Sequence, residues 1–287
     1  MNFAVKVATS GGLSPGAIGL FRWGTFAVVL LLVLRLQWFQ RLTRAQWPSP
    51  RDAAWAVLAG MLLFAPAHLA YYLALTRTST IEGTVLNTTS PVWTALLAFL
   101  FLRERVAGRR GVAIAVGFIG AWIVSVGFSV PQMRAGNTAG NLLYLAGVLA
   151  ESGVAVLSAS LIRRSSGITV LALQIVGASV TLGLAPILLG DALPFQAGHV
   201  APSAVAAVAY LILFPGLICF TVWYMLVEKT PLSLMVLSIL LQPPLSALVG
   251  WLVLKEPLTT QLAAGTAFVL TALLLGATEE RERLAPV

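Results

Sequence analysis

The sequence predicts an all-α, polytopic membrane protein with about ten transmembrane helices, arranged as two inverted repeats of about five helices each. Composition is the first observation behind this prediction: 59% of the 287 residues are hydrophobic, 10% are charged, and the mean hydropathy is +0.92. Ordinary soluble domains hold roughly 45–50% apolar and about 25% charged residues. The apolar residues also gather in runs long enough to cross a bilayer, and part of the first half of the chain recurs in the second.

The apolar runs define the predicted helices. A helix needs about 20 apolar residues to cross a hydrocarbon core of about 30 Å, and irregular backbone cannot face lipid, so each long run is expected to be helical. Full spans are predicted at 15–37, 53–75, 80–102, 109–129, 141–161, 167–190, 203–227, 231–254 and 259–277. A shorter apolar segment at 2–10 precedes them. By comparison with the second half, we expect this first helix to lack roughly the first dozen residues of a span, either because the given sequence starts late or because the helix itself is cut short.

An internal repeat relates the two halves of the chain. The segment "SPVWTALLAFLFLRERV", residues 90–106, returns without a gap as "QPPLSALVGWLVLKEPL", residues 242–258, with an offset of 152 residues between Pro91 and Pro243 (243 − 91). The same offset joins Glu104 to Glu256, Tyr72 to Tyr224 and Thr78 to Thr230. We therefore expect one repeat over residues 1–130, a second over 140–278 and a cytoplasmic tail at 279–287.

The basic residues predict the orientation of the helices. If 2–10 is the first crossing, alternate connectors and the tail hold most of the arginines and lysines: Arg35, Arg41, Arg44, Arg51, Arg103, Arg105, Arg109, Arg110, Arg163, Arg164, Lys229, Arg281 and Arg283. The opposite connectors hold only Arg77, Arg134 and Lys255. The positive-inside rule places the first set and both termini in the cytoplasm. Because about five crossings per half is an odd number, the second half enters from the other side, so the repeat is predicted to be inverted.

These features resemble the drug/metabolite transporter superfamily, specifically its EamA-type ten-helix transporters. The resemblance covers nearly the whole chain and rests on "NFAVKVATSGGLSPGAIGLFRW", residues 2–23, and on the two Pro-to-Glu segments quoted above. The chain departs from the family in its short first helix and in "LAESGV", where many relatives have a tryptophan. The resemblance implies a central cavity that opens alternately to each side of a bacterial inner membrane. Amino-acid export is common among members, and the aromatic amino-acid exporters of the YddG type are the nearest analogy.

Glu151 is a charged residue within a predicted span. It lies about ten residues into the helix at 141–161, which places it about 15 Å deep, near the bilayer midplane. Acidic residues at such depth usually face a cavity and mark ion or substrate paths, so Glu151 is predicted to bind substrate and to exchange a proton during transport. The alternative is a protonated or hydrogen-bonded glutamate that holds two helices together beside the small residues Ser152 and Gly153.

Aromatic residues at matched positions of the two halves form a second candidate site. His68, Tyr71 and Tyr72 follow the spacing i, i+3, i+4, so they share one face of a predicted span. Trp223 and Tyr224 occupy the positions equivalent to the two tyrosines. These faces are predicted to bind substrate by stacking on a flat ring. The alternative is that the tyrosines belong to the interfacial aromatic belt and that His68 only hydrogen-bonds a neighbour.

Prolines interrupt one predicted span in each half. Asn87 and further polar residues precede Pro91, and Gln242 precedes Pro243 and Pro244. A proline removes a backbone donor and frees a carbonyl, so both helices are expected to kink and to expose polar groups. We predict that the three prolines are hinges and that Asn87 and Gln242 contribute to the substrate site. The alternative is a static kink whose polar side chains satisfy the backbone of their own helix.

Several other polar residues are predicted to be structural. Arg22 is expected to snorkel or to form an ion pair, with Glu82 as a candidate partner, although an anionic carboxylate substrate would also suit it. Gln174 is expected to hydrogen-bond between packed helices. Charged residues at the connector edges are expected to cap helices and set orientation: Arg103, Glu104, Lys255 and Glu256.

The sequence favours a secondary transporter over other function classes. Its net charge of +8 lies in short connectors, where membrane orientation explains it, so no nucleic-acid partner is expected. Neither an HExxH zinc pattern nor a Walker-type phosphate loop is present, so an enzyme is much less favoured and no cofactor or metal is expected. The expected partners are the lipid bilayer and a small-molecule substrate, and the chain could act as a monomer or a homodimer. Export of amino acids or related amphipathic compounds is favoured; multidrug, cation or other metabolite transport on the same fold is the alternative.

Overall fold

The computed structural model of the chain is helical, with no β-strand among the residues that it describes. These are residues 1–43, 45–104, 108–126, 135–190, 200–245, 248 and 259–284. The chain divides into two compact units, the first comprising residues 1–83 and 136–229 and the second comprising residues 84–135 and 230–287. Each unit therefore combines segments from both halves of the chain.

The first unit holds most of the candidate site residues. From the first half of the chain it contains α1 (Asn2–Ser10), α2 (Pro15–Val33), α3 (Gln37–Thr43), α4 (Pro50–Ala59), the π-helical η1 (Gly60–Phe64), α5 (Ala65–Arg77) and the start of α6 (Thr80–Asn87). From the second half it contains α9 (Thr138–Ile162), α10 (Gly167–Leu189), α11 (Pro202–Leu211), the π-helical η3 (Ile212–Phe220) and α12 (Thr221–Val227). A short 3-10 segment, η2 (Ala135–Asn137), precedes α9.

Serine caps begin two of these helices. The Ser14 side chain accepts a hydrogen bond from the Ala17 backbone nitrogen at 3.1 Å, and α2 starts with a proline. Ser49 accepts one from the Asp52 nitrogen at 3.2 Å, and α4 also starts with a proline. A serine cap pairs one of the free backbone donors of the first turn, and a proline there loses no bond. The helix starts are therefore encoded locally.

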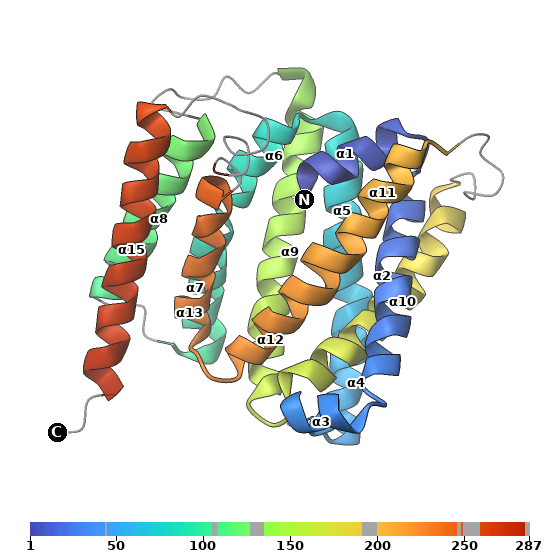
Figure 1. The fold of residues 1–287 in the computed structure, drawn as a ribbon, viewed down its shortest axis with the longest axis horizontal. Helices are drawn as coiled ribbons and strands as arrows, with labels where there is room; N and C mark the ends of the chain where they lie inside the picture. The colour runs from blue at the N-terminus through green and yellow to red at the C-terminus, as the bar shows by residue number, and fades with distance from the viewer. Residues whose placement is uncertain are drawn as a thin grey trace. The chain divides into compact units, whose positions relative to one another are not determined.

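Helices from the two halves pack side by side in the first unit. α2 lies against α10, and α5 lies against α9 (Figure 1). A Cβ at Gly60 would overlap the carbonyl oxygen of Gln174 on α10, and a Cβ at Gly147 would lie 2.9 Å from Cε1 of Tyr71. Small residues thus allow the close approaches that are common between membrane helices. Gly153 has no described atom near its Cβ position, so the close approach considered there is not found.

A π-helical segment interrupts the equivalent helix in each half. The segment η1 starts at Gly60 and η3 at Ile212, which reproduces the 152-residue offset of the repeat (212 − 60). Pro66 follows η1 in the first turn of α5, and Pro215 lies inside η3. A proline leaves one carbonyl without its usual donor, which favours a wider turn. Such segments are rare and occur frequently at functional sites.

The second unit is smaller and contains both predicted proline breaks. It is built from α7 (Ser90–Leu102), α8 (Arg109–Val126), α13 (Leu232–Met235), the 3-10 segment η4 (Val236–Leu241) and α15 (Thr260–Leu284). α8 and α15 pack side by side (Figure 1). Glu104 accepts a hydrogen bond from the Ser233 nitrogen at 3.1 Å, and Arg110 donates to the Ser233 hydroxyl at 2.8 Å. Glu104 thus caps a helix, as predicted, whereas Lys255 and Glu256 lie outside the described residues.

Among the described residues, six helices are long and apolar enough to cross a membrane by length and composition: Pro15–Val33, Pro50–Arg77, Glu82–Leu102, Thr138–Ile162, Gly167–Ile187 and Pro202–Val227. They agree with six of the predicted spans to within a few residues. Shorter apolar helices cover Leu232–Leu245 and Thr260–Gly276. The rest of the span predicted at 231–254 lies largely outside the described residues.

Candidate functional site

Trp23 of α2 is at the centre of a buried aromatic cluster. Its ring meets those of Phe64, His68 and Phe220 edge-on, at centroid distances of 4.8, 4.5 and 5.4 Å. His68 stacks on Phe64 at 4.3 Å, and its Nδ1–H donates to the Phe64 carbonyl at 2.9 Å, since a carbonyl can only accept. The predicted ring-binding face at His68 is therefore covered by the protein's own aromatic residues in this structure.

Tyr71 connects α5 to the predicted midplane carboxylate on α9. Its hydroxyl donates to Glu151 Oε2 at 2.6 Å, a length typical of a hydroxyl bonded to a carboxylate. The Tyr71 ring packs on Tyr144 at 4.8 Å, and the Tyr144 hydroxyl donates to Asn2 at 3.1 Å. Both tyrosines are buried, whereas Glu151 is partly exposed. The structure thus brings Tyr71 and Glu151 together, and their hydrogen bond links two helices.

Arg22 of α2 is fully buried and bonded to Tyr72. Its Nη1 donates to the Tyr72 hydroxyl at 3.1 Å and lies 3.5 Å from the Met1 sulfur. The Trp23 indole nitrogen donates to the same hydroxyl at 3.0 Å, and the guanidinium lies 4.4 Å from the centre of the Trp23 ring, within cation–π range. The prediction that Arg22 snorkels is wrong, because the side chain is 0% exposed.

Glu82 has partners other than Arg22. Its carboxylate accepts hydrogen bonds from the Thr78 hydroxyl at 2.8 Å, the Asn141 amide at 2.8 Å and the Asn137 amide at 3.1 Å. These donors compensate for burying a carboxylate that is only 6% exposed. The considered ion pair between Arg22 and Glu82 is therefore wrong: the guanidinium bonds Tyr72 instead.

Tyr224 matches Tyr72 in position and burial but has neutral partners. Its hydroxyl donates to Gln174 Oε1 at 2.5 Å and lies 3.2 Å from the Ser158 hydroxyl. Gln174 Nε2 in turn donates to Ser158 at 2.9 Å. Gln174 thereby links α10 to α9 and α12, which confirms its predicted hydrogen bonding between packed helices. Trp223 is partly exposed and contacts the Tyr224 ring at 5.5 Å.

The repeat offset in the sequence also relates these two networks. Gln174 lies 152 residues after Arg22 (174 − 22), the same offset that separates Tyr72 from Tyr224. Applying the offset to every polar residue in the spans would have paired these four positions. The same offset joins His68 to Phe220 (220 − 68). The other partners, Trp23, Phe64 and Ser158, are brought in by packing.

Pro91 divides the fourth predicted span into two helices. α6 ends at Asn87 and α7 begins at Ser90, directly before the proline. The hydroxyls of Thr88 and Thr89 donate to the carbonyls of Val85 and Leu86 at 2.7 and 2.6 Å. The polar side chains at this break therefore bond the backbone of their own helix, as in the static alternative, and the helix is interrupted at the expected place.

The second proline break follows a 3-10 segment. η4 ends at Leu241, and Pro243 and Pro244 are both buried just after it. The 3-10 segment is tighter and less well bonded than an α-helix, and residues 242–245, which include both prolines, are again α-helical. The Asn87 amide points to Gln242 Oε1 at 3.5 Å, the outer limit of a hydrogen bond. These two predicted site residues are thus neighbours within the second unit.

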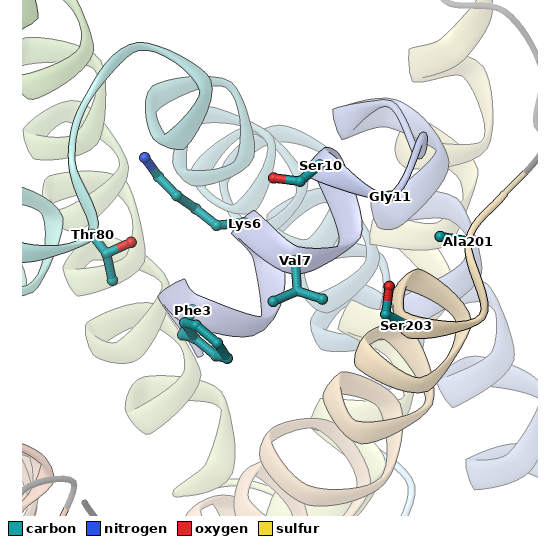
Figure 2. A pocket seen from close by; sticks show the side chains of 8 residues that line it. All are labelled: Phe3, Lys6, Val7, Ser10, Gly11, Thr80, Ala201 and Ser203. Atoms are coloured by element: carbon teal, nitrogen blue, oxygen red, sulfur yellow. The ribbon is translucent and has the colours of Figure 1, made fainter. Parts of the chain in front are cut away.

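A cavity of about 440 Å³ lies beside α1 in the first unit. Figure 2 shows its lining, in which α1 contributes the side chains of Phe3, Lys6, Val7 and Ser10. The remaining lining residues are Gly11, Thr80, Ala201 and Ser203. Most of the lining is small or polar, and Lys6 supplies a positive charge. None of the predicted site residues lines this cavity.

Comparison with protein families identifies the family of this chain. The model of the EamA-like transporter family matches residues 1–126 and 138–278. The chain belongs to the EamA-like transporter family. It is therefore a multi-pass membrane protein of the transporter class, and the resemblance drawn from its residues is confirmed at the level of this family.

Two curated relatives of this family member are named as transporters. It is 25% identical over 264 residues to an "Uncharacterized transporter" of Archaeoglobus fulgidus, covering 90% of this chain and 87% of the relative. It is also 25% identical over 259 residues to the "Uncharacterized transporter YdfC" of Bacillus subtilis, covering 90% of this chain and 80% of the relative. One protein crystal structure is similar with a TM-score of 0.77 and 17% identity, over 99% of this chain and 93% of its own. That likeness supports the fold alone.

Proposed function

We propose that this EamA family member is a secondary transporter that exports small amphipathic metabolites, amino acids among them, by alternating access around a central cavity. About ten crossings form two inverted repeats over residues 1–130 and 140–278, and both termini, including the tail at 279–287, lie in the cytoplasm. The inner membrane is the proposed location. One observation carries the proposal: two buried tyrosine networks, at Tyr72 and Tyr224, stand at equivalent places of the repeat. Repeated halves with substrate sites at midplane depth are characteristic of secondary transporters.

The chemistry of the first unit supports an amphipathic substrate. Aromatic rings surround Trp23, the Arg22 cation is buried beside them, and the Glu151 carboxylate lies on a neighbouring helix. Such a set can contact a ring, an anionic group and a cationic group of one small molecule. The proposed substrate contacts are His68, Tyr71, Tyr72, Asn87, Glu151, Trp223, Tyr224 and Gln242.

The interrupted helices supply places for movement. Pro91, Pro243 and Pro244 are the proposed hinges, since a helix bends at low cost where backbone hydrogen bonds are already missing. The π-helical segments η1 and η3 add a second matched pair of weak points. Bending at equivalent points of the two halves would open one side of the site while closing the other.

Counterflow in proteoliposomes tests this function. Vesicles loaded with unlabelled phenylalanine should accumulate labelled phenylalanine faster than protein-free vesicles, and leucine should compete. A cationic drug exchanged in place of the amino acids would favour the multidrug or cation alternative. Direction is tested separately, because cells that express an exporter should lose a preloaded amino acid faster than cells without it. Absence of flux for all of these compounds would contradict the proposal.

A further inference from the structure

The Arg22 guanidinium presents two adjacent donors for which the described part of the chain supplies no acceptor. Nη1 is occupied by Tyr72 and Met1, but Nε and Nη2 are buried and have no hydrogen-bond partner among the described residues. These two nitrogens point along one edge of the planar group. An arginine edge with two parallel N–H donors matches both oxygens of a carboxylate.

The position of this unused edge is fixed by its surroundings. The Tyr72 hydroxyl holds Nη1, and the Trp23 ring lies under the guanidinium carbon at 4.4 Å. Glu151 interacts with Arg22 electrostatically, but its hydrogen bond is to Tyr71, and no ion pair joins it to Arg22 in the described part of the chain. The charge of Arg22 is thus partly balanced, while its Nε and Nη2 donors have no acceptor among the described residues.

The equivalent place in the second half shows that packing does not require a cation. Gln174 is neutral there, and both its oxygen and its nitrogen are bonded, to Tyr224 and Ser158. A buried charge with unpaired donors costs free energy that a satisfied amide does not. The unpaired edge of Arg22 therefore points to a ligand that arrives with two acceptor oxygens.

We propose that Arg22 binds the carboxylate group of the transported substrate. This inference rests on the proposed function and narrows its substrate class to carboxylate-bearing amphipathic molecules. A ring on the substrate would meet the aromatic cluster around Trp23, and an ammonium group would be drawn to Glu151. A zwitterionic amino acid supplies all three groups, whereas a purely cationic drug is repelled by Arg22.

The first helix lies between Arg22 and the cavity of Figure 2. One face of α1 carries Met1, whose sulfur contacts Arg22, together with the buried Val5 and Ala8. The opposite face of the helix lines the cavity (Figure 2). A displacement of α1 then opens Arg22 to the cavity, where Lys6 adds a second positive charge along the path of an anion.

Binding of benzoate, a simple aromatic carboxylate, tests the site independently of transport. Calorimetric titration of the purified full chain in detergent should show binding, and Arg22→Gln should raise the Kd by about 10- to 100-fold, the usual effect of losing charge-assisted hydrogen bonds. Arg22→Lys keeps the charge without the fork and should fall between the two. The matched control is Gln174→Ala, which should change the Kd by about twofold or less. No binding by the folded wild type, or an unchanged Kd in Arg22→Gln, would overturn the inference.

If Arg22→Gln fails to fold, a series of substrates on the wild-type protein tests whether a carboxylate is required. Phenylalanine, phenylalaninamide and phenethylamine differ at the carboxylate, and counterflow of the amide and the amine should be at least about 10-fold slower. Equal rates for all three would overturn the role of Arg22 while leaving the transporter function intact. Benzoate binding that depends on Arg22, without transport of phenylalanine, would keep the carboxylate site and refute the amino-acid substrate.

Discussion

The two buried tyrosine networks of the first unit share a place in the repeat and differ in charge. Tyr72 accepts hydrogen bonds from Arg22 and Trp23, whereas Tyr224 donates one to Gln174. The neutral network satisfies its own polar groups, and the charged one leaves two donors unpaired among the described residues. A duplicated framework can thus keep a tyrosine in one place while one copy serves packing and the other is free to serve a ligand.

The residues next to Tyr72 and Tyr224 also differ in charge. Tyr71, next to Tyr72, bonds the carboxylate of Glu151, while its repeat equivalent Trp223 packs against the ring of Tyr224. Arg22 and Glu151 therefore both lie beside the network that contains Tyr72. Variants that exchange or remove these groups should affect the two networks unequally.

The largest effect is expected when the neutral network receives a charge. Gln174→Arg places a second buried cation where no carboxylate lies within the local hydrogen-bond network, and it should lower the free energy of unfolding by about 3–5 kcal/mol. Thermal and denaturant unfolding in detergent measure this change. The matched variant is Arg22→Gln, which removes a buried charge and should stay within about 1 kcal/mol of the wild type. Equal stability of Gln174→Arg and the wild type would show that the two places do not differ in polarity.

The next effect comes from the close helix crossing beside the neutral network. Gly60→Val puts side-chain atoms against the carbonyl of Gln174 and should lower the free energy of unfolding by about 3 kcal/mol, because backbone rather than a flexible side chain must move. Denaturation in detergent is again the measurement. Gly153→Ala is the control, since its Cβ meets no described atom, and it should be neutral or slightly stabilising.

Removing the tyrosine hydroxyl from each network compares how much each network contributes to stability. Tyr72→Phe leaves donors of both Arg22 and Trp23 unpaired and should lower the free energy of unfolding by about 2 kcal/mol. Tyr224→Phe should cost about 1 kcal/mol, because Gln174 and Ser158 still bond each other. Paired unfolding curves of the two variants compare them. The reverse order would contradict the assignment of the charged network as the less satisfied one.

The smallest effect on stability is expected at Glu151. In Glu151→Gln the Tyr71 hydroxyl can still donate to an oxygen at the same place, so the free energy of unfolding should change by about 0.5 kcal/mol or less. An amide cannot take up a proton, so any dependence of substrate counterflow on pH that arises from this group should disappear. Rates measured across a pH series, with Glu82→Gln as the control, test this. A pH profile identical to that of the wild type would assign Glu151 to structure alone.

The helices were largely predictable, since helix formation in this chain is a local matter. Six of the predicted spans coincide with long apolar helical segments in the described part of the chain, and the segment that contains Pro91 is interrupted there, as expected. Helix orientation and the number of crossings stay predictions, because they depend on the membrane. The predicted pairing of Arg22 failed because two residues on separate helices must be both at similar depth and on facing sides, and only depth follows from position in a span.

The sequence by itself determined that this is a multi-helix membrane protein with related halves, because apolar run length, proline breaks and a constant offset are properties of the chain read along its length. Only the tertiary structure decided that Tyr71 meets Glu151, that Gln174 is satisfied and that Arg22 is not. Those outcomes depend on how helices such as α2 and α10, which come from distant parts of the chain, are rotated and cross each other. They also depend on whether a packed side chain places its donors and acceptors within hydrogen-bonding distance of its neighbour.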